Sequence, residues 1–157
     1  MKRIIYTRPD GGVSVVIPTG EIPFEDVLKK DVPPNATNVS IVDASKIPSD
    51  RYFRNAWVCP NGKIEHDMTK CREIHKDRLR ALRAPKLEDL DVEYQRADER
   101  EIACHDINDQ DSVRQARTDK REITAQKQTL RDVTKDPRIV AATTPDELKA
   151  AIPACLS

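Results

Sequence analysis

The residues that form turns and small cores are confined to the first part of the chain, and charged residues dominate the region after it. All four glycines and five of the six aromatic residues lie at or before residue 62 of the 157. Residues 67–136 contain 33 charged residues, one proline and no glycine. A chain with this little apolar content cannot bury one large core. We therefore predict an α+β protein with a small β-rich N-terminal module at 1–66 and a charged helical region at 67–136.

The N-terminal module is predicted to contain two β-hairpins, with Tyr52, Phe53 and Trp57 as core side chains. Pro9-Asp10-Gly11-Gly12 is a turn sequence, because proline presets φ and glycine permits positive φ. Pro60-Asn61-Gly62 is a second turn sequence between the short runs 57–59 and 63–65. The other predicted elements are strands at 2–7, 13–17 and 38–43, a short helix at 23–30, and a turn with a short helix at 48–56.

Two stripes with the same three-and-four spacing predict an antiparallel pair of helices. Their members are Leu87, Leu90, Tyr94, Ala97, Glu101 and Cys104 in the first, and Val113, Ala116, Lys120, Ile123, Lys127 and Leu130 in the second. A polar stretch at 106–111 separates the stripes, so we predict a helical hairpin with arms at about 87–105 and 112–131. The helical region starts at Asp67 and is expected to be interrupted or kinked at Pro85.

The last part of the chain, residues 137–157, is predicted to hold a short helix and a tail. Thr144-Pro145-Asp146-Glu147 is a capping box with proline at the first helical position. We expect the helix that it opens to reach Ala151.

The charged residues form three blocks of alternating sign. Residues 70–86 carry seven bases and two acids, residues 87–111 ten acids and two bases, and residues 112–131 six bases and two acids. The hairpin would place the acidic arm beside the second basic block, so we expect these two to pair within the chain. The first basic block leaves nucleic-acid binding open as a minor alternative. Its bases recur on every helix face without interleaved aromatic residues, so nucleic acid is not the expected partner.

Both stripes are incomplete as apolar surfaces. Glu101, Lys120 and Lys127 interrupt them, while Ala97 and Ala116 bury little area. An isolated pair of such arms would be barely stable. We therefore expect the arms to rest on the N-terminal module or on other copies of the chain, which favours a homo-oligomer.

The cysteines at 59, 71, 104 and 155 contain no Cys-x-x-Cys pair, and we expect reduced thiols. A zinc site is an open alternative, because Cys59, His66, Cys71 and His75 could supply four ligands. Their spacing differs from the usual zinc-binding clips, so we assign no metal ligand. The residues leave open whether any of the four cysteines forms a disulfide.

No catalytic constellation is present in the sequence, and no catalytic or cofactor-binding residue is assigned. The stretch 106–111 resembles a calcium loop, but it lacks the glycine at position six and has Arg117 where a bidentate glutamate is needed. Cys104 and His105 are adjacent on a helix, where side chains diverge too far for a thiolate–imidazole pair. No signal peptide or membrane span is expected, because no apolar run is long enough. We expect neither an enzyme nor a membrane protein.

Several segments resemble small uncharacterised proteins that lie among the structural and tail genes of tailed bacteriophages and prophages. The resemblance runs from Ile5 to Pro153 and is weakest over 102–126. The segments that carry it are YTRPDGGVSVV, FRNAWV, REIHKDRLRALRAPKLEDLDVEYQRADE, KQTLRDVTKDPRI and TPDELKAAIP. That family has no catalytic residues to carry over to this chain.

The resemblance implies a structural or assembly protein of the virion, made in the bacterial host cytoplasm and associated with the tail. Its partners would be tail, fibre or head–tail proteins and further copies of itself, bound without catalysis. A tail-fibre assembly chaperone that is absent from the mature particle is the alternative. A small nucleic-acid-binding regulator is a third hypothesis, and it rests only on residues 70–86.

Overall fold

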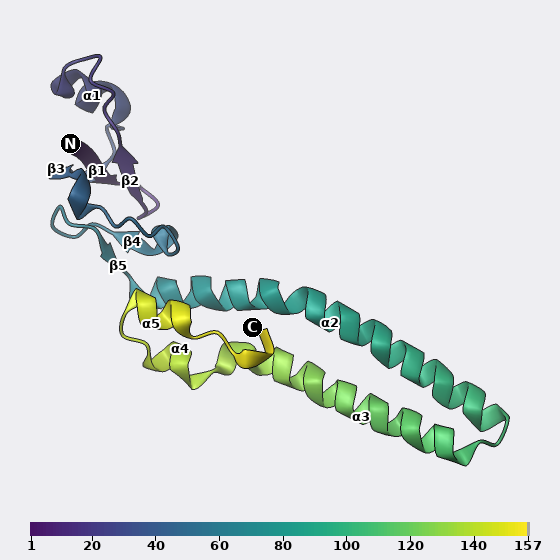
Figure 1. The fold of residues 1–157 in the computed structure, drawn as a ribbon. Coiled ribbons are helices and arrows are strands. Elements are labelled where there is room, and N and C mark those ends of the chain that lie inside the picture. The colour runs from purple at the N-terminus through teal and green to yellow at the C-terminus, as the bar shows by residue number, and fades with distance from the viewer. Residues whose placement is uncertain (157) are drawn as a thin grey trace. The chain divides into compact units, whose positions relative to one another are not determined.

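The computed structural model describes residues 1–156 and confirms the α+β class, with a small antiparallel β region followed by long helices (Figure 1). The chain divides into two units, Met1–Ile74 and His75–Ser157, which we call the N-terminal unit and the C-terminal unit. Within residues 1–156, every helix is too short or too polar to cross a lipid bilayer.

The predicted first hairpin and third strand are confirmed in the N-terminal unit. Strands β1 (Lys2–Thr7), β2 (Val13–Val16) and β3 (Thr37–Asp43) form an antiparallel sheet in the order β2-β1-β3. The hairpin turn is closed by two backbone hydrogen bonds between Arg8 and the glycines, and Gly11 has a φ of +79°, which glycine adopts at little cost. A register shift opposite the C-terminal end of β1 accompanies a φ of +51° at Asn38, which is typical of a β-bulge.

One core cluster of the N-terminal unit packs on the face of this sheet that carries Ile5. Ile5 and Val13 pack with Trp57, Cys59 and Ile64, all of which are buried. The second hairpin is also confirmed, but its strands are β4 (Trp57–Val58) and β5 (Glu65–His66), with a wider connection than predicted. Cys59 and Ile64 lie within this connection and bury their side chains in the core.

Short helices complete the N-terminal unit. They are α1 (Phe24–Asp31), η1 (Ala44–Lys46) and η2 (Arg54–Ala56). Helix α1 confirms the predicted helix at 23–30 and carries acids in its first turn and bases in its last, as the helix dipole favours. Phe53 is buried as predicted, whereas Tyr52 is half-buried and meets the Phe53 ring edge-on at 4.7 Å between centroids.

One 39-residue helix, α2 (Met68–Asp106), spans the region in which an interruption or a kink was predicted at Pro85. Asp67 caps its start by accepting hydrogen bonds from the backbone of Thr69 and Lys70. Of the two predicted outcomes at Pro85, an interruption or a kink, the interruption does not occur: α2 is continuous and bent. Pro85 lies on an exposed position, where water can hydrogen-bond the carbonyl that lacks its usual helical donor. The predicted first arm is therefore the C-terminal part of α2.

The second arm is α3 (Gln110–Asp132), and four short helical segments come after it. They are η3 (Val133–Lys135), α4 (Pro137–Ala141), α5 (Pro145–Ala150) and η4 (Ala154–Leu156). The predicted capping box is confirmed: the Thr144 hydroxyl accepts from the Glu147 backbone, and the Glu147 carboxylate accepts from the Thr144 backbone. Helix α4 was not predicted, although Asp136-Pro137 marks its start, with the Asp136 side chain accepting from the Arg138 backbone.

The C-terminal segment packs on the base of the hairpin, where α4 and α5 lie beside the long helices (Figure 1). Ile139 and Leu148 are fully buried. The buried His75 ring lies 3.1 Å from the Ala151 carbonyl oxygen through Nε2. Arg83 donates to the carbonyl of Arg131 at 2.8 Å, and Lys86 donates to that of Cys155 at 2.9 Å. Side chains from α2 thus tie the end of the chain to the hairpin base.

Ile5→Ala should destabilise the N-terminal unit by about 2–5 kcal/mol, because Ile5 is fully buried in its core. Ile17→Ala, at a residue that is 58% exposed, is the matched control and should change stability by no more than about 0.5 kcal/mol. Urea unfolding followed by the fluorescence of the single tryptophan, Trp57, measures both. Equal effects of the two substitutions would contradict this core.

Candidate protein-interaction surface

The two predicted stripes meet along one line between α2 and α3, which we call the seam. Leu90 and Ala97 are buried on α2, and Val113, Ile123 and Leu130 are buried on α3. The remaining stripe residues are all buried or half-buried: Leu87, Tyr94, Glu101, Cys104, Ala116, Lys120 and Lys127. The spacing in the sequence therefore identified the contact surface of both helices.

The charged residues that interrupt the stripes are paired across the seam. Glu101 accepts from Arg117 Nε at 2.6 Å and from Lys120 Nζ at 3.0 Å. Lys120 also donates to Asp98 Oδ1 at 2.5 Å. These hydrogen bonds lower the pKa of Glu101 below its ordinary value and raise the pKa of Lys120. The hydrogen bonds thus stabilise the ionised forms of Glu101 and Lys120.

A second paired charge lies nearer the hairpin base. Lys127 is 9% exposed, and its ammonium lies 2.7 Å from Asp91 Oδ1. The same ammonium lies 4.7 Å from the centre of the Tyr94 ring, and that of Lys120 lies 5.4 Å from it. Both ammonium groups are attracted to the half-buried Tyr94 ring, because the face of an aromatic ring is electron-rich.

These pairs fix the register of the hairpin. Asp98 faces Lys120 and Asp91 faces Lys127, so the pairs are seven residues apart on each helix. A slip by one turn would separate both the Asp98–Lys120 pair and the Asp91–Lys127 pair. The seam is therefore specified by charge as well as by apolar contact.

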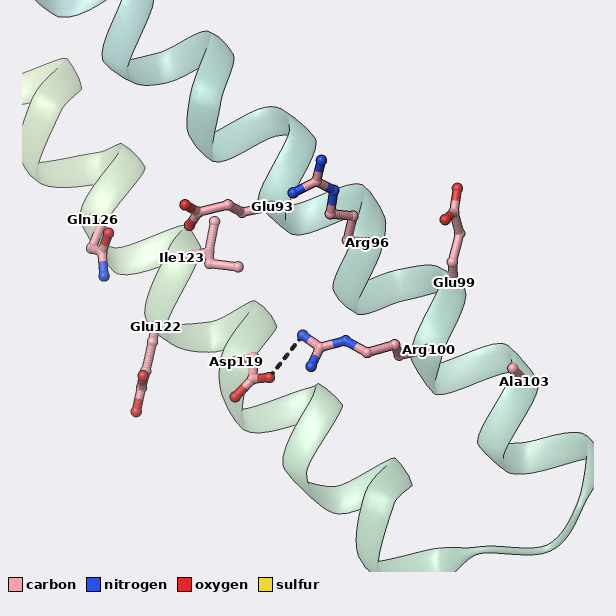
Figure 2. Close-up of a pocket in the computed structure, with 9 residues that line it drawn as sticks. All are labelled: Glu93, Arg96, Glu99, Arg100, Ala103, Asp119, Glu122, Ile123 and Gln126. Carbon is pink, nitrogen blue, oxygen red and sulfur yellow. Dashed lines mark hydrogen bonds and ion pairs between the residues drawn. The ribbon is translucent and has the colours of Figure 1, made fainter.

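A solvent-open groove of about 750 Å³ runs along one side of the seam. In Figure 2, Ile123 points between the helices, and Arg100 reaches across to Asp119, with a distance of 3.0 Å. Glu99 and Glu122 point away from the opposite helix. The lining residues are Glu93, Arg96, Glu99, Arg100, Ala103, Asp119, Glu122, Ile123 and Gln126.

The groove is acidic, because its lining holds four carboxylates and two guanidiniums. One carboxylate, Asp119, is neutralised by Arg100. Among residues 1–156, Glu93, Glu99 and Glu122 form no ion pair. An open groove with an isoleucine at its floor and uncompensated carboxylates along its edges suits contact with a basic or amphipathic protein surface.

This groove was not predicted from the sequence, although the sequence holds a signal for it. Most lining residues directly precede a stripe residue in the chain: Glu93, Arg96, Arg100, Ala103, Asp119, Glu122 and Gln126. Positions that flank the stripes on one side must border the seam. Whether they form a groove or a filled surface depends on side-chain packing, which the spacing does not contain.

The four residues considered as zinc ligands are divided between other roles. Cys59 belongs to the N-terminal core, and His66 Nε2 lies 3.1 Å from the Trp57 indole nitrogen. Cys71 is buried in the N-terminal unit, while His75 contacts the Ala151 carbonyl in the C-terminal unit. Across residues 1–156, no three His, Cys, Asp or Glu side chains are placed to hold a metal ion. The four cysteines have free thiols.

The polar stretch considered as a calcium loop forms the hairpin turn. Asp109 caps α3 by accepting from the Ser112 backbone at 3.2 Å, and hydrogen bonds from Ser112 lower its pKa. Asn108 adopts a φ of +59°, and its backbone donates to the His105 carbonyl. Asn108 therefore lies at the end of one helix, and Asp109 caps the start of the next.

The basic block at 70–86 is largely engaged within the chain. Arg83 and Lys86 bind backbone carbonyls of the C-terminal segment, and Arg80 pairs with Asp77 at 2.5 Å. Arg72, Lys76 and Arg78 also interact with other residues. Lys70 lies apart from these and faces a cavity in the N-terminal unit.

Comparison of the chain with protein-family models, with curated protein sequences and with solved structures gives no match.

Thiol reagents should distinguish two classes of cysteine. Cys59 and Cys71 are buried, and burial raises the pKa of both thiols, so they should react slowly. Cys104 and Cys155 are half-buried and should react first. Labelling of the native chain, followed by peptide mass spectrometry, measures each rate. A single common rate for all four would contradict this arrangement.

Glu101→Gln should weaken the hairpin at neutral pH and reduce its sensitivity to acid. The pKa of Glu101 is lowered from 4.5 in the folded chain, so its stabilising effect is complete above that value. The effect is lost as the pH falls through the folded pKa, because the unfolded chain then binds more protons. Urea midpoints from far-UV circular dichroism, measured from about pH 7 to about pH 3, test this.

The matched control for this experiment is Glu88→Gln. Glu88 is an exposed residue on the same helix and forms no ion pair among residues 1–156. Its substitution should leave the pH dependence of the midpoint unchanged. If both variants follow the wild-type pH profile, the charged seam does not contribute to stability.

Proposed function

We propose that this chain is a structural or assembly protein of a tailed bacteriophage virion, tail-associated, which acts by binding other proteins. The observation that carries the proposal is the helical hairpin, whose outer part consists of two helices alone (Figure 1). The charged residues of the seam pair with one another across the two helices, while the groove and the outer faces of the hairpin remain open to a partner.

The outer part of the hairpin offers both polar and apolar contacts. Val92, Ile102 and Ile107 are 48%, 58% and 75% exposed, and the acidic groove lies between the helices. Exposed apolar side chains beside unpaired charges are typical of surfaces that bind other proteins. A thin two-helix arm buries little of its own area, so a partner would stabilise it as well as bind it.

The phage assignment itself comes from the resemblance of the chain to proteins encoded among phage structural and tail genes. A protein of that class needs binding surfaces whose shape is fixed by contacts within the chain, and it needs no reactive centre. The charged register of the seam supplies such a surface. The expected partners are tail, fibre or head–tail proteins and further copies of this chain.

Purified particles should contain the chain in a fixed number of copies, which quantitative mass spectrometry of density-purified virions measures. Absence from the particle would contradict a structural role in the virion. The fibre-chaperone alternative then makes a distinct prediction, because soluble trimeric fibre would form only when this chain is co-expressed. If the chain is absent from particles and the fibre folds without it, both functions are excluded.

A further inference from the structure

A cavity of about 550 Å³ lies beside the first hairpin turn of the N-terminal unit, and we call it the basic turn cavity. Three bases converge on it from three separate segments: Arg8 from the turn, Arg54 from η2, and Lys70 from the first turns of α2. The other lining residues are Asp10, Gly12, Val13 and Asn55. Only the fold brings these segments together.

Arg8 is held in place on the wall of this cavity. Its Nε donates to Asp10 Oδ1 at 3.1 Å, and its Nη1 lies 3.5 Å from Ser14 Oγ. The backbone of Gly12 donates to the same Asp10 oxygen at 2.8 Å. The guanidinium lies directly over Gly12, so close that a Cβ there would displace it. Arg8 Nε and Nη1 thus bind groups of the first hairpin, and these contacts fix the position of the guanidinium charge.

The other polar groups of the cavity are not used within the chain. Among residues 1–156, the side chains of Arg54, Asn55 and Lys70 form no hydrogen bond or ion pair. The charge of Lys70 does act on Asp10, whose pKa is lowered mainly by Arg8 and Gly12. Three cations and one carboxylate leave the cavity with a charge of about +2 near neutral pH.

We propose that the basic turn cavity binds a phosphate dianion, either free or as a phosphomonoester. A phosphomonoester carries about −1.5 to −2 charge near pH 7, which matches the excess positive charge of the cavity. Two guanidiniums, an ammonium and a carboxamide supply the donors that phosphate oxygens accept from. A carboxylate or a phosphodiester, with a single charge, would leave one cation uncompensated. This site is independent of the proposed virion function.

The rest of the basic block supports a local site rather than a nucleic-acid surface. Lys70 belongs to that block in the sequence, but its other members bind carbonyls, acids or other groups in the chain. The free charge is therefore concentrated at the cavity and does not extend along α2.

Isothermal titration calorimetry of the full chain with inorganic phosphate, against chloride at equal ionic strength, tests the site. Arg54→Gln and Lys70→Gln should each weaken phosphate binding about tenfold or more. Gly12→Ala should weaken it too, because the new Cβ displaces Arg8. Lys63→Gln is the matched control, since it removes an exposed charge of the same unit outside this cavity, and it should leave binding unchanged.

Two competition experiments decide which class of phosphate ligand binds. A nucleoside 5′-monophosphate should compete with phosphate, whereas a dinucleoside monophosphate without a terminal phosphate should not. Equal competition by both would overturn the dianion assignment. No difference between phosphate and chloride, or wild-type affinity in both Arg54→Gln and Lys70→Gln, would overturn the site. Unchanged Trp57 fluorescence in each variant shows that a loss of binding is not a loss of fold.

Discussion

The charge pairs between α2 and α3 set the register on which the C-terminal unit depends. Lys120 lies between Asp98 and Glu101, and Lys127 binds Asp91 one heptad away, so the helices cannot slide without separating both pairs. That register brings the end of α3 beside the part of α2 that carries Arg83. The C-terminal segment packs there, with its carbonyls bound by side chains of α2. Loss of the seam would therefore loosen the tail as well as the hairpin.

The same charges explain how a chain so poor in apolar residues can form a long hairpin. Salt bridges on an open surface contribute little, but partial burial beside Tyr94 and the aliphatic stripe makes an incorrect register costly. The result is a thin arm with open flanks, a shape suited to binding other proteins. The N-terminal unit differs, because its core cluster of Ile5, Val13, Trp57, Cys59 and Ile64 is apolar. Of the bases around its turn, Arg8 pairs with Asp10, while Arg54 and Lys70 have no side-chain partner among residues 1–156.

Much of the fold could be predicted from the sequence because it depends on local rules. Turn residues located the first hairpin, and the three-and-four spacing located both faces of the seam, even where Glu101 and Lys127 interrupt it. The sequence left open an interruption or a kink at Pro85, because it does not say whether a proline faces solvent. Pro85 is exposed, and α2 continues through it as one bent helix. Helix α4 was missed because it has only five residues and is stabilised by packing through Ile139.

The sequence by itself determined which residues are apolar, charged or turn-forming, and so the division into a β-rich part and a charged helical hairpin. Only the tertiary structure decided which charges find partners. It paired Lys120 with Asp98 and Glu101, left Glu93 and Glu122 beside an open groove, and gathered Arg8, Arg54 and Lys70 around one cavity. The physical reason is distance: periodicity acts over a few residues, whereas Coulomb attraction and hydrogen bonding depend on separations in space that the fold alone sets.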